Sequence, residues 1–372
     1  MLRGAESAPC ASGVRHERVE TRETSTYHVV GTELAVARPE LDARLSEEGV
    51  QLSGTGRVHF DPHVISDALR QLEALGRVGV QQHSTKGGRT VSLLVPGDTT
   101  GRTTYVTRAV RRKGMLYNRF RNLADESGEA GEAVLRHSLR EAGPHLIPMT
   151  PGFGEVRTVM KTKLHGALDS GAWLHTLDPE TQTPRTAFAV PMEMKNRRLT
   201  LYPLHKEVHQ LLSKAAELQV AHPHYPIVPV LVCRRAHSRL FWMAKDLGFR
   251  VWATNRQFTT LPREMDQRRY DEVRTELRPT DLTLVPATGP PPTIQQFFRE
   301  TIVAAAPLAA PRWAAAASTV LPYAQQLRSD DVAPADRQHL VRELRQELEG
   351  VMPAAGFDRE FLSWSLPDLE DQ

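Results

Sequence analysis

The sequence predicts an α+β protein in three parts: an N-terminal domain of helices and a hairpin, a central mixed sheet flanked by helices, and a C-terminal helical region. Three observations support this. The chain has 372 residues, more than one core usually accommodates. Helical and strand periodicities alternate through residues 128–253, as in a sheet covered by helices. The composition then changes near residue 286, where proline and alanine become frequent.

Composition excludes several classes of protein. With 40% hydrophobic and 24% charged residues, the chain resembles an ordinary globular protein. The longest apolar stretch, residues 304–317, is interrupted by Pro307, Pro311 and Arg312, so no membrane span is predicted. Residues 1–20 lack the apolar centre of a signal peptide. The cysteines, Cys10 and Cys233, are too few for a disulfide framework or a cysteine-rich zinc site. These features predict a cytoplasmic protein without membrane association.

The charge is distributed unevenly along the chain. Residues 329–372 contain eleven acidic residues and four arginines, a net charge of −7. Since the whole chain has a net charge of +3, residues 1–328 carry +10. A basic body with an acidic tail is typical of proteins that bind polyanions. The alternative interpretation is a solvated tail with no role in binding.

Residues 27–98 are expected to form the first domain, after a flexible N-terminal segment 1–26. A helix is predicted over residues 61–76, with Asp61 as the N-cap and Gly76 as the stop, and a shorter one over 40–48. Strands at 78–83 and 89–95 follow, joined by a basic glycine turn. This arrangement resembles a winged-helix domain, a family in which the helix enters the DNA major groove. The resemblance implies DNA contacts by Arg70, Lys86 and Arg89; winged helices also serve as protein-docking modules.

Residues 99–123 are predicted to be a basic connecting segment. Between residues 101 and 122 there are seven cationic residues and no acidic ones, with three aromatic residues interleaved. Guanidinium groups neutralise phosphates and aromatic rings stack on bases, so this composition favours nucleic-acid binding. The candidate contacts are Arg108, Arg111, Arg112 and Lys113. The alternative is a solvated helix whose aromatic residues pack against a neighbouring domain.

Residues 124–285 are predicted to form the central domain. Its pattern is a helix, several strands, a helix, a strand, a helix and a final strand. The helices are expected at 128–143, 204–219 and 237–247, and the strands at 146–149, 156–160, 167–177, 187–194, 227–233 and 249–253. Pro191 lies inside a predicted strand, which indicates a bulge or bend there.

Charged residues lie at the ends of two of these strands. Because alternate side chains of a strand share a face, Glu193 and Lys195 point the same way while Met194 faces the core. Asp169 lies one strand earlier. The order of elements and these residues resemble the PD-(D/E)XK restriction-endonuclease-like nuclease superfamily. That resemblance implies catalytic roles for Asp169, Glu193 and Lys195, with Glu132 as the helical glutamate.

The chemistry of these residue types agrees with the resemblance. Mg²⁺, with Mn²⁺ as a substitute, prefers hard oxygen ligands, which Asp169, Glu193 and the Met194 carbonyl would supply. Lys195 would orient the attacking water or stabilise the charged transition state. Arg197 and Arg198 would hold the DNA backbone. The expected function is metal-dependent DNA cleavage, within a defence or repair assembly.

Other interpretations of the same residues remain open. A glutamate and a lysine two residues apart at the end of a strand are frequent by chance, and a surface ion pair would also account for them. A non-catalytic DNA-binding protein that uses a degenerate nuclease fold as a platform is the alternative function. A zinc site at His205 and His209 is disfavoured, because zinc proteases place glutamate after the first histidine, where this chain has Lys206.

Residues 286–372 are predicted to be a helical region that ends in the acidic tail. Alanine-rich residues 313–320 suit close packing between helices. Such a region more often mediates association than catalysis, so it is the expected contact with a protein partner or with a second copy of the chain.

Overall fold

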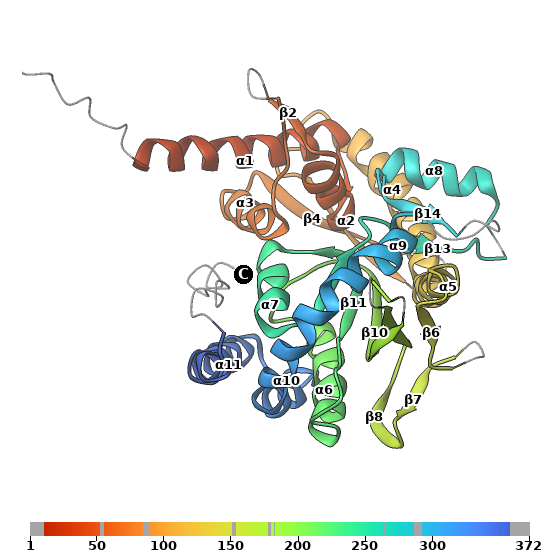
Figure 1. Cartoon of the computed structure of the whole chain (residues 1–372). Helices are drawn as coiled ribbons and strands as arrows, with labels where there is room; N and C mark the ends of the chain where they lie inside the picture. Colours follow the sequence, from red (N-terminus) through yellow and green to blue (C-terminus); the bar gives the residue numbers. More distant parts are fainter. Residues whose placement is uncertain are drawn as a thin grey trace, which may run out of the picture. The chain divides into compact units, whose positions relative to one another are not determined.

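The computed structural model describes residues 11–52, 56–84, 89–150, 154–177, 180–181, 183–263, 265–285 and 292–357 (Figure 1). The chain divides into two compact units, and each is described by itself. Unit 1 comprises Met1–Leu123 and Leu261–Leu282, and unit 2 comprises Ala124–Thr260 and Thr283–Gln372. None of the described helices is long and apolar enough to cross a lipid bilayer.

Unit 1 combines helices with a small antiparallel sheet. The helical segments are α1 (Ala11–Glu33), α2 (Arg38–Asp42), the π-helical η1 (Ala43–Glu48), α3 (Pro62–Ala74), the greater part of α4 (Thr103–Asp125), and α8 (Gln267–Leu277). The strands β1 (Val36–Ala37), β5 (Thr90–Pro96) and β4 (Val78–Ser84) form a sheet in that order, and β2 (Val50–Leu52) pairs with β3 (Gly56–Val58).

The predicted helix and hairpin of the first domain are present. Asp61 precedes α3 in an extended conformation, and Gly76 follows it with φ at 65°. The strands of the hairpin pair in antiparallel register from Val78 and Pro96 to Ser84 and Thr90. The turn that contains Lys86 lies outside the described residues. The α+β class is therefore confirmed, while the winged-helix resemblance remains a proposal.

The segment predicted to be flexible, residues 1–26, is instead helical from Ala11 onward. The C-terminal half of α1 packs against α3, and Ser25, Thr26 and Val30 are buried. Two of these three side chains are small and polar, so they gave no apolar periodicity in the sequence.

The predicted boundary near residue 285 is also wrong. Residues 261–282 belong to unit 1, where the Glu276 carbonyl accepts hydrogen bonds from Lys113 and Arg44.

Unit 2 is built on a five-stranded mixed sheet. Its strands β6 (Leu146–Pro148), β9 (Ser170–Leu177), β10 (Pro184–Leu201), β11 (Val230–Ala236) and β12 (Arg250–Ala253) lie side by side in chain order. The β9 strand is antiparallel to both of its neighbours, β6 and β10, whereas β10, β11 and β12 are parallel. A separate hairpin of β7 (Val156–Val159) and β8 (Thr162–Leu168) leads into β9, and β13 (Gln257–Thr259) pairs with β14 (Leu282–Leu284).

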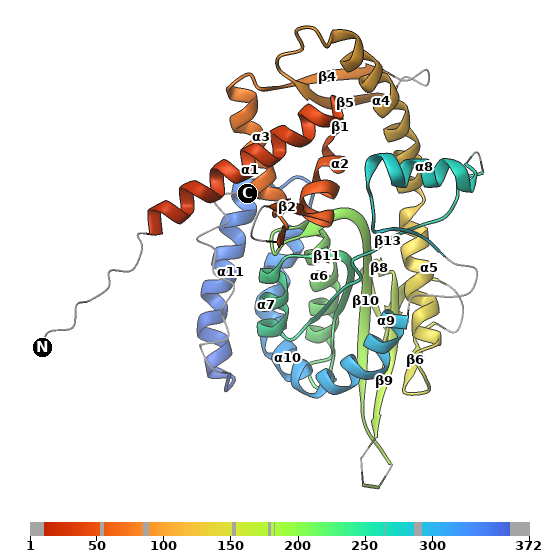
Figure 2. The same ribbon diagram turned by 90° about the horizontal axis from the view of Figure 1, so that it is seen from above.

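Helices cover both faces of this sheet. On one face lies α5 (Ser127–Arg140), and on the other lie α6 (Lys206–Ala221) and α7 (Ser238–Leu247) (Figure 2). The β10 side chains alternate between these faces: Met192 and Met194 join the core cluster that contains α5, and Ala189 joins the cluster that contains α6. Glu193, between the two methionines, therefore points toward α6.

Pro191 does not produce the expected bulge. The pairing of β10 with β9 is continuous from Ala187 to Met192. The irregularities of β10 lie elsewhere, between Pro184 and Ala187 on one edge and between Lys195 and Thr200 on the other. The register is therefore regular where β10 carries Glu193.

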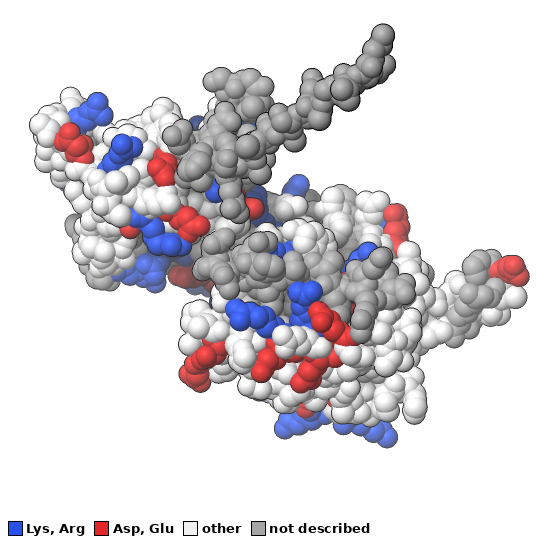
Figure 3. All heavy atoms as spheres, turned by 90° about the vertical axis from the view of Figure 1, so that its left-hand side faces the viewer, with Lys and Arg blue, Asp and Glu red and all other residues white. Residues whose placement is uncertain are grey.

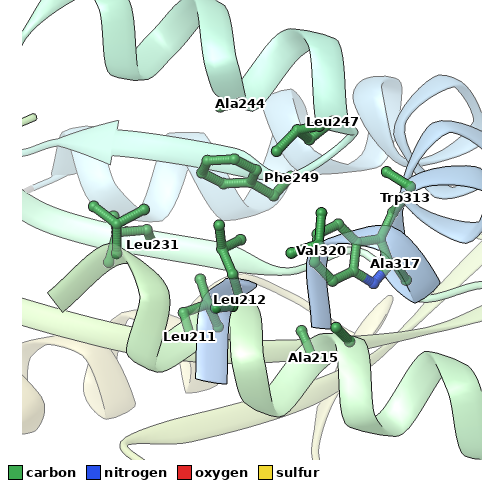
Figure 4. Close-up of a cluster of buried hydrophobic side chains, with 14 of the residues drawn as sticks. Leu211, Leu212, Ala215, Leu231, Ala244, Leu247, Phe249, Trp313, Ala317 and Val320 are labelled. Carbon is green, nitrogen blue, oxygen red and sulfur yellow. The ribbon is translucent and has the colours of Figure 1, made fainter. Parts of the chain in front are cut away.

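The C-terminal helices complete the core of unit 2, so residues 292–357 are not a separate appendage. They comprise α9 (Pro292–Gln296), the π-helical η2 (Phe297–Thr301), α10 (Ile302–Leu327) and α11 (Pro334–Ala354). Trp313, Ala317 and Val320 of α10 lie against α6 and Phe249 in one buried cluster (Figure 4). The small residues predicted to pack closely thus pack within the same chain. Of the eleven acidic residues in segment 329–372, six lie at or before residue 349 in the described part of the chain, and the other five lie beyond residue 357, outside it.

Candidate active site

Three of the predicted catalytic residues meet at the start of β9 and the middle of β10. Asp169 occupies the single position between β8 and β9, where the sequence predicted one continuous strand. Glu193 and Lys195 lie on the neighbouring strand, and the Met194 N–H donates a hydrogen bond of 2.7 Å to Asp169 Oδ2. The side chain of Met194 is buried in the core, as expected. The predicted convergence of two carboxylates and one ammonium is therefore observed.

The two carboxyl groups influence each other strongly. Asp169 keeps 18% of its side chain exposed, whereas Glu193 keeps 1%. The pKa of Asp169 is raised to about 7, first by burial and second by the negative charge of Glu193. A side-chain hydrogen bond with Glu193 acts in the same direction. Because a neighbouring negative charge disfavours ionisation, Asp169 keeps its proton to a higher pH than an isolated aspartate does.

Lys195 contacts both carboxylates. Its Nζ lies 2.6 Å from Glu193 Oε2 and 3.8 Å from Asp169 Oδ2. Burial by itself would lower the pKa of Lys195, but the charges of Glu193 and Asp169 outweigh it and hold that pKa above its usual value. The lysine is therefore an ammonium ion at neutral pH.

A second lysine, which the sequence did not identify, completes the cluster. Lys214 of α6 lies 2.5 Å from Glu193 Oε1 and also donates to the carbonyl of Ala167. Although burial raises the pKa of Glu193, the Lys195 and Lys214 ammonium groups lower it below its usual range. The only sequence signal for Lys214 is its place in an amphipathic helix after β10, because a lysine otherwise buried on a helix face needs a partner.

Glu132 is near this cluster but does not join it. Its Oε2 lies 3.2 Å from Arg136 Nη1, and the same nitrogen donates to the Asp169 carbonyl at 3.4 Å. Arg136 therefore stands between the helical glutamate and the β8–β9 junction. Glu132 and Arg136 line a pocket of about 460 Å³, together with Glu129, Ala130, Ala133, Gly154, Glu155, Thr260 and Val285.

The site offers the kind of ligand atoms that a divalent metal needs. The carboxylates of Asp169 and Glu193 are hard oxygen donors within reach of one cation, since one ammonium already contacts both. Within the described part of the chain, no group of three or more His, Cys, Asp or Glu side chains is arranged to hold a metal. Two carboxylates on their own suit an ion of the Mg²⁺ type, which binds through few protein ligands and retains water. The Met194 main chain lies beside Asp169, since its N–H donates to Asp169 Oδ2, and the role of its carbonyl as a metal ligand stays a prediction.

The residues that follow Lys195 have different roles. Asn196 is buried, and its amide donates to the carbonyls of Ser127 and Phe258 at 2.6 and 2.7 Å, which fixes the end of β10 against α5 and β13. Arg197 keeps 68% of its side chain exposed and lies 3.3 Å from Glu207 Oε1 at the start of α6. Arg198 donates to Gln257 Oε1 at 3.1 Å. Of the two predicted DNA-binding arginines, Arg197 is the more accessible.

The predicted DNA contacts of unit 1 divide into accessible and buried residues. Arg108 and Arg111 are exposed on α4. Arg112 is exposed but lies 2.5 Å from Glu276 Oε1, and Arg70 is exposed beside Asp67. Arg89 donates to Asn122 Oδ1 at 3.0 Å. On the surface seen in Figure 3, basic and acidic side chains are interspersed rather than segregated.

Lys113 is not the accessible DNA contact that the sequence predicted. Its ammonium is buried in unit 1, 2.5 Å from Glu40 Oε1 and 3.0 Å from Glu33 Oε2, so it is not available to a DNA phosphate. Three further α4 positions around it, Gly114, Leu116 and Phe120, are also buried, which shows that this face of α4 belongs to a core. The number of cations in a segment does not show which of them lie on the buried face of the helix.

The two histidines considered for zinc do not form a metal site in the described structure. His209 is fully buried, its Nε2 lies 2.7 Å from the Pro203 carbonyl, and burial lowers its pKa to about 4. His205 contacts the Tyr202 ring. Comparison with known proteins adds no constraint: no family model, no curated protein and no solved structure matches this chain.

Proposed function

We propose that unit 2 is a metal-dependent deoxyribonuclease domain of the PD-(D/E)XK type, and that unit 1 engages the DNA. The observation that carries the proposal is the convergence of Asp169, Glu193 and Lys195. Asp169 directly precedes the second strand of the mixed sheet, and Glu193 and Lys195 lie on the third, which suits the family resemblance. A chance Glu–Lys pair on a surface would not be buried against a second carboxylate.

The site residues suit phosphodiester hydrolysis. Bound Mg²⁺ would supply a Lewis acid and an activated water. Asp169 and Glu193 would hold it, and the raised pKa of Asp169 means that its proton must leave first. Lys195, charged at neutral pH, would stabilise the negative charge that develops on the phosphate oxygens. Arg197, exposed at the rim, would hold the phosphate backbone.

In unit 1, the winged-helix resemblance rests on α3 and the β4–β5 hairpin. Arg108 and Arg111 extend the DNA-contacting surface along α4 under this proposal, and Tyr105 is an exposed aromatic residue on the same helix. Together they would bind the backbone without reading sequence.

One observation favours a second candidate function, a non-catalytic DNA-binding protein. Both oxygens of Glu193 are engaged by ammonium groups, at 2.6 and 2.5 Å, so the cluster compensates its charge without a metal. A nuclease fold retained as a platform would show the same ion pairs.

Nicking of supercoiled plasmid separates the two functions. The full-length chain is expected to cut with Mg²⁺ or Mn²⁺, and Glu193→Gln is expected to reduce the rate by at least about 100-fold, as loss of an electrostatic catalytic contact does. Addition of a chelator should have the same effect as the substitution. DNA binding, measured by fluorescence anisotropy, should remain in the variant. Persistent binding without cutting by the unmodified chain, across both metals, would establish the non-catalytic function instead.

A further inference from the structure

The two lysines that neutralise Glu193 are held in different ways. Lys214 donates to the Ala167 carbonyl as well as to Glu193, so it joins α6 to the C-terminal end of β8 and to β10. Gly166 lies against its side chain, since a methyl group there would come within 3.3 Å of Lys214 Cε. Lys214 is thus fixed by main-chain and packing contacts as well as by charge.

Among the residues that the structure describes, Lys195 has no main-chain partner of this kind. Its ammonium is held by the two carboxylates, at 2.6 Å from Glu193 Oε2 and 3.8 Å from Asp169 Oδ2. It therefore lies within reach of both groups that would bind a divalent cation. Its side chain is 16% exposed, so this position opens to solvent.

We propose that the Lys195 ammonium is the resident cation of the site, which leaves the two carboxylates when a divalent cation binds, while Lys214 stays on Glu193 and keeps it oriented. This inference rests on the proposed metal-dependent function and adds a form of regulation to it. Lys195 becomes available to a substrate phosphate only after the exchange. The site is thereby kept from presenting its lysine to DNA in the absence of the metal.

The geometry assigns the two lysines different effects on metal affinity: Lys195 should weaken metal binding, and Lys214 should not. Lys195 competes with the metal for Glu193 Oε2 and for Asp169, whereas Lys214 engages Oε1 and leaves Oε2 free. Both contribute one positive charge in direct contact with Glu193. A difference between variants at the two positions therefore reports site occupancy rather than overall charge.

The test measures Mn²⁺ binding to the full-length chain by electron paramagnetic resonance, without DNA. Lys195→Met is expected to bind Mn²⁺ about tenfold more tightly than the unmodified chain, because a charged hydrogen bond no longer has to be broken. Lys195→Gln, which keeps a polar side chain, should shift affinity in the same direction. Lys214→Met is the matched control and should not tighten binding. Circular dichroism melts would establish that each variant is folded.

Several outcomes separate this inference from the proposed function. Equal or weaker affinity in both Lys195 variants would overturn the exchange. Equal tightening by Lys214→Met would also overturn it, because a general charge effect would then suffice. Absence of Mn²⁺ binding in every folded variant would remove the metal site and the proposed function with it. Tight binding by Lys195→Met together with no DNA cleavage by the unmodified chain would support the exchange and reject the nuclease.

Discussion

Each unit of the protein contains a buried cluster of lysine and carboxylate groups, and the two clusters differ in how like charges are arranged. In unit 1, Lys113 lies between Glu40 and Glu33, and Arg44 lies 2.9 Å from Glu40 and 3.0 Å from Glu33. Every carboxylate there faces two cations. In unit 2, Glu193 also contacts two ammonium groups, but Asp169 faces the carboxylate of Glu193 and shares a hydrogen bond with it.

The pKa values follow the same difference. Burial raises the pKa of Glu40, and its cationic neighbours oppose that increase. For Asp169, burial and a second carboxylate act together and raise its pKa to about 7. An arrangement that brings like charges together is unfavourable for folding, which makes the unit 2 cluster the better candidate for function. The unit 1 cluster connects α1, α2, η1, α4 and α8, which is a structural role.

The largest expected effect comes from breaking the unit 1 cluster. Lys113→Met would leave Glu40, whose side chain is 0% exposed, with Arg44 alone. Breaking a buried pair on one side costs roughly 3 to 5 kcal/mol, so the free energy of unfolding of unit 1 should fall by about this amount. Chemical denaturation followed by circular dichroism measures it.

The matched control is Arg112→Met on the same helix. Arg112 is 61% exposed and pairs with Glu276 at the surface, so the change should be under about 1 kcal/mol. Equal losses in the two variants would show that burial does not distinguish these pairs, and the structural role of the Lys113 cluster would have to be abandoned.

The next effect has the opposite sign and belongs to unit 2. The pKa of Asp169 is higher in the folded chain than the ordinary value of 3.8, so ionisation destabilises the fold. This penalty is absent below about pH 4, grows between pH 4 and 7, and is complete above pH 7. Asp169→Asn removes it and should stabilise unit 2 by about 2 to 4 kcal/mol at pH 8, with little gain at pH 4.

The comparison with Glu193→Gln sharpens this prediction. The pKa of Glu193 is lowered in the folded chain, so its ionisation stabilises the fold. This stabilisation is fully present at pH values above the pKa of Glu193 in the unfolded chain, and it is lost as the pH falls through the pKa in the folded chain. Glu193→Gln should therefore destabilise unit 2 at pH 8. Thermal melts of both variants at pH 4 and pH 8 provide the measurement, and shifts of the same sign at pH 8 would contradict the assigned charge arrangement.

Much of the fold was predictable because it depends on local periodicity. The helices of unit 2, the α3 helix and the β4–β5 hairpin all carry repeating apolar positions or turn residues. The convergence of Asp169, Glu193 and Lys195 was also predictable, since strand alternation sets which side chains share a face. Lys214 was not, because its contact with Glu193 depends on how α6 lies over the sheet. The assignment of Lys113 failed for the same reason, since only packing shows which face of α4 is buried.

The smallest expected effect concerns DNA binding by α4 and compares its exposed and paired arginines. Arg108→Gln with Arg111→Gln removes two exposed charges, so the proposed binding should weaken and its slope against the logarithm of salt concentration should decrease by about 2. Arg112→Gln with Arg119→Gln removes the same charge, but these side chains lie 2.5 Å from Glu276 and Glu272. Fluorescence anisotropy titrations at several salt concentrations should show a smaller change for the second pair, because each of those guanidinium groups already has a carboxylate partner. An unchanged slope for the first pair would place the DNA-binding surface away from α4.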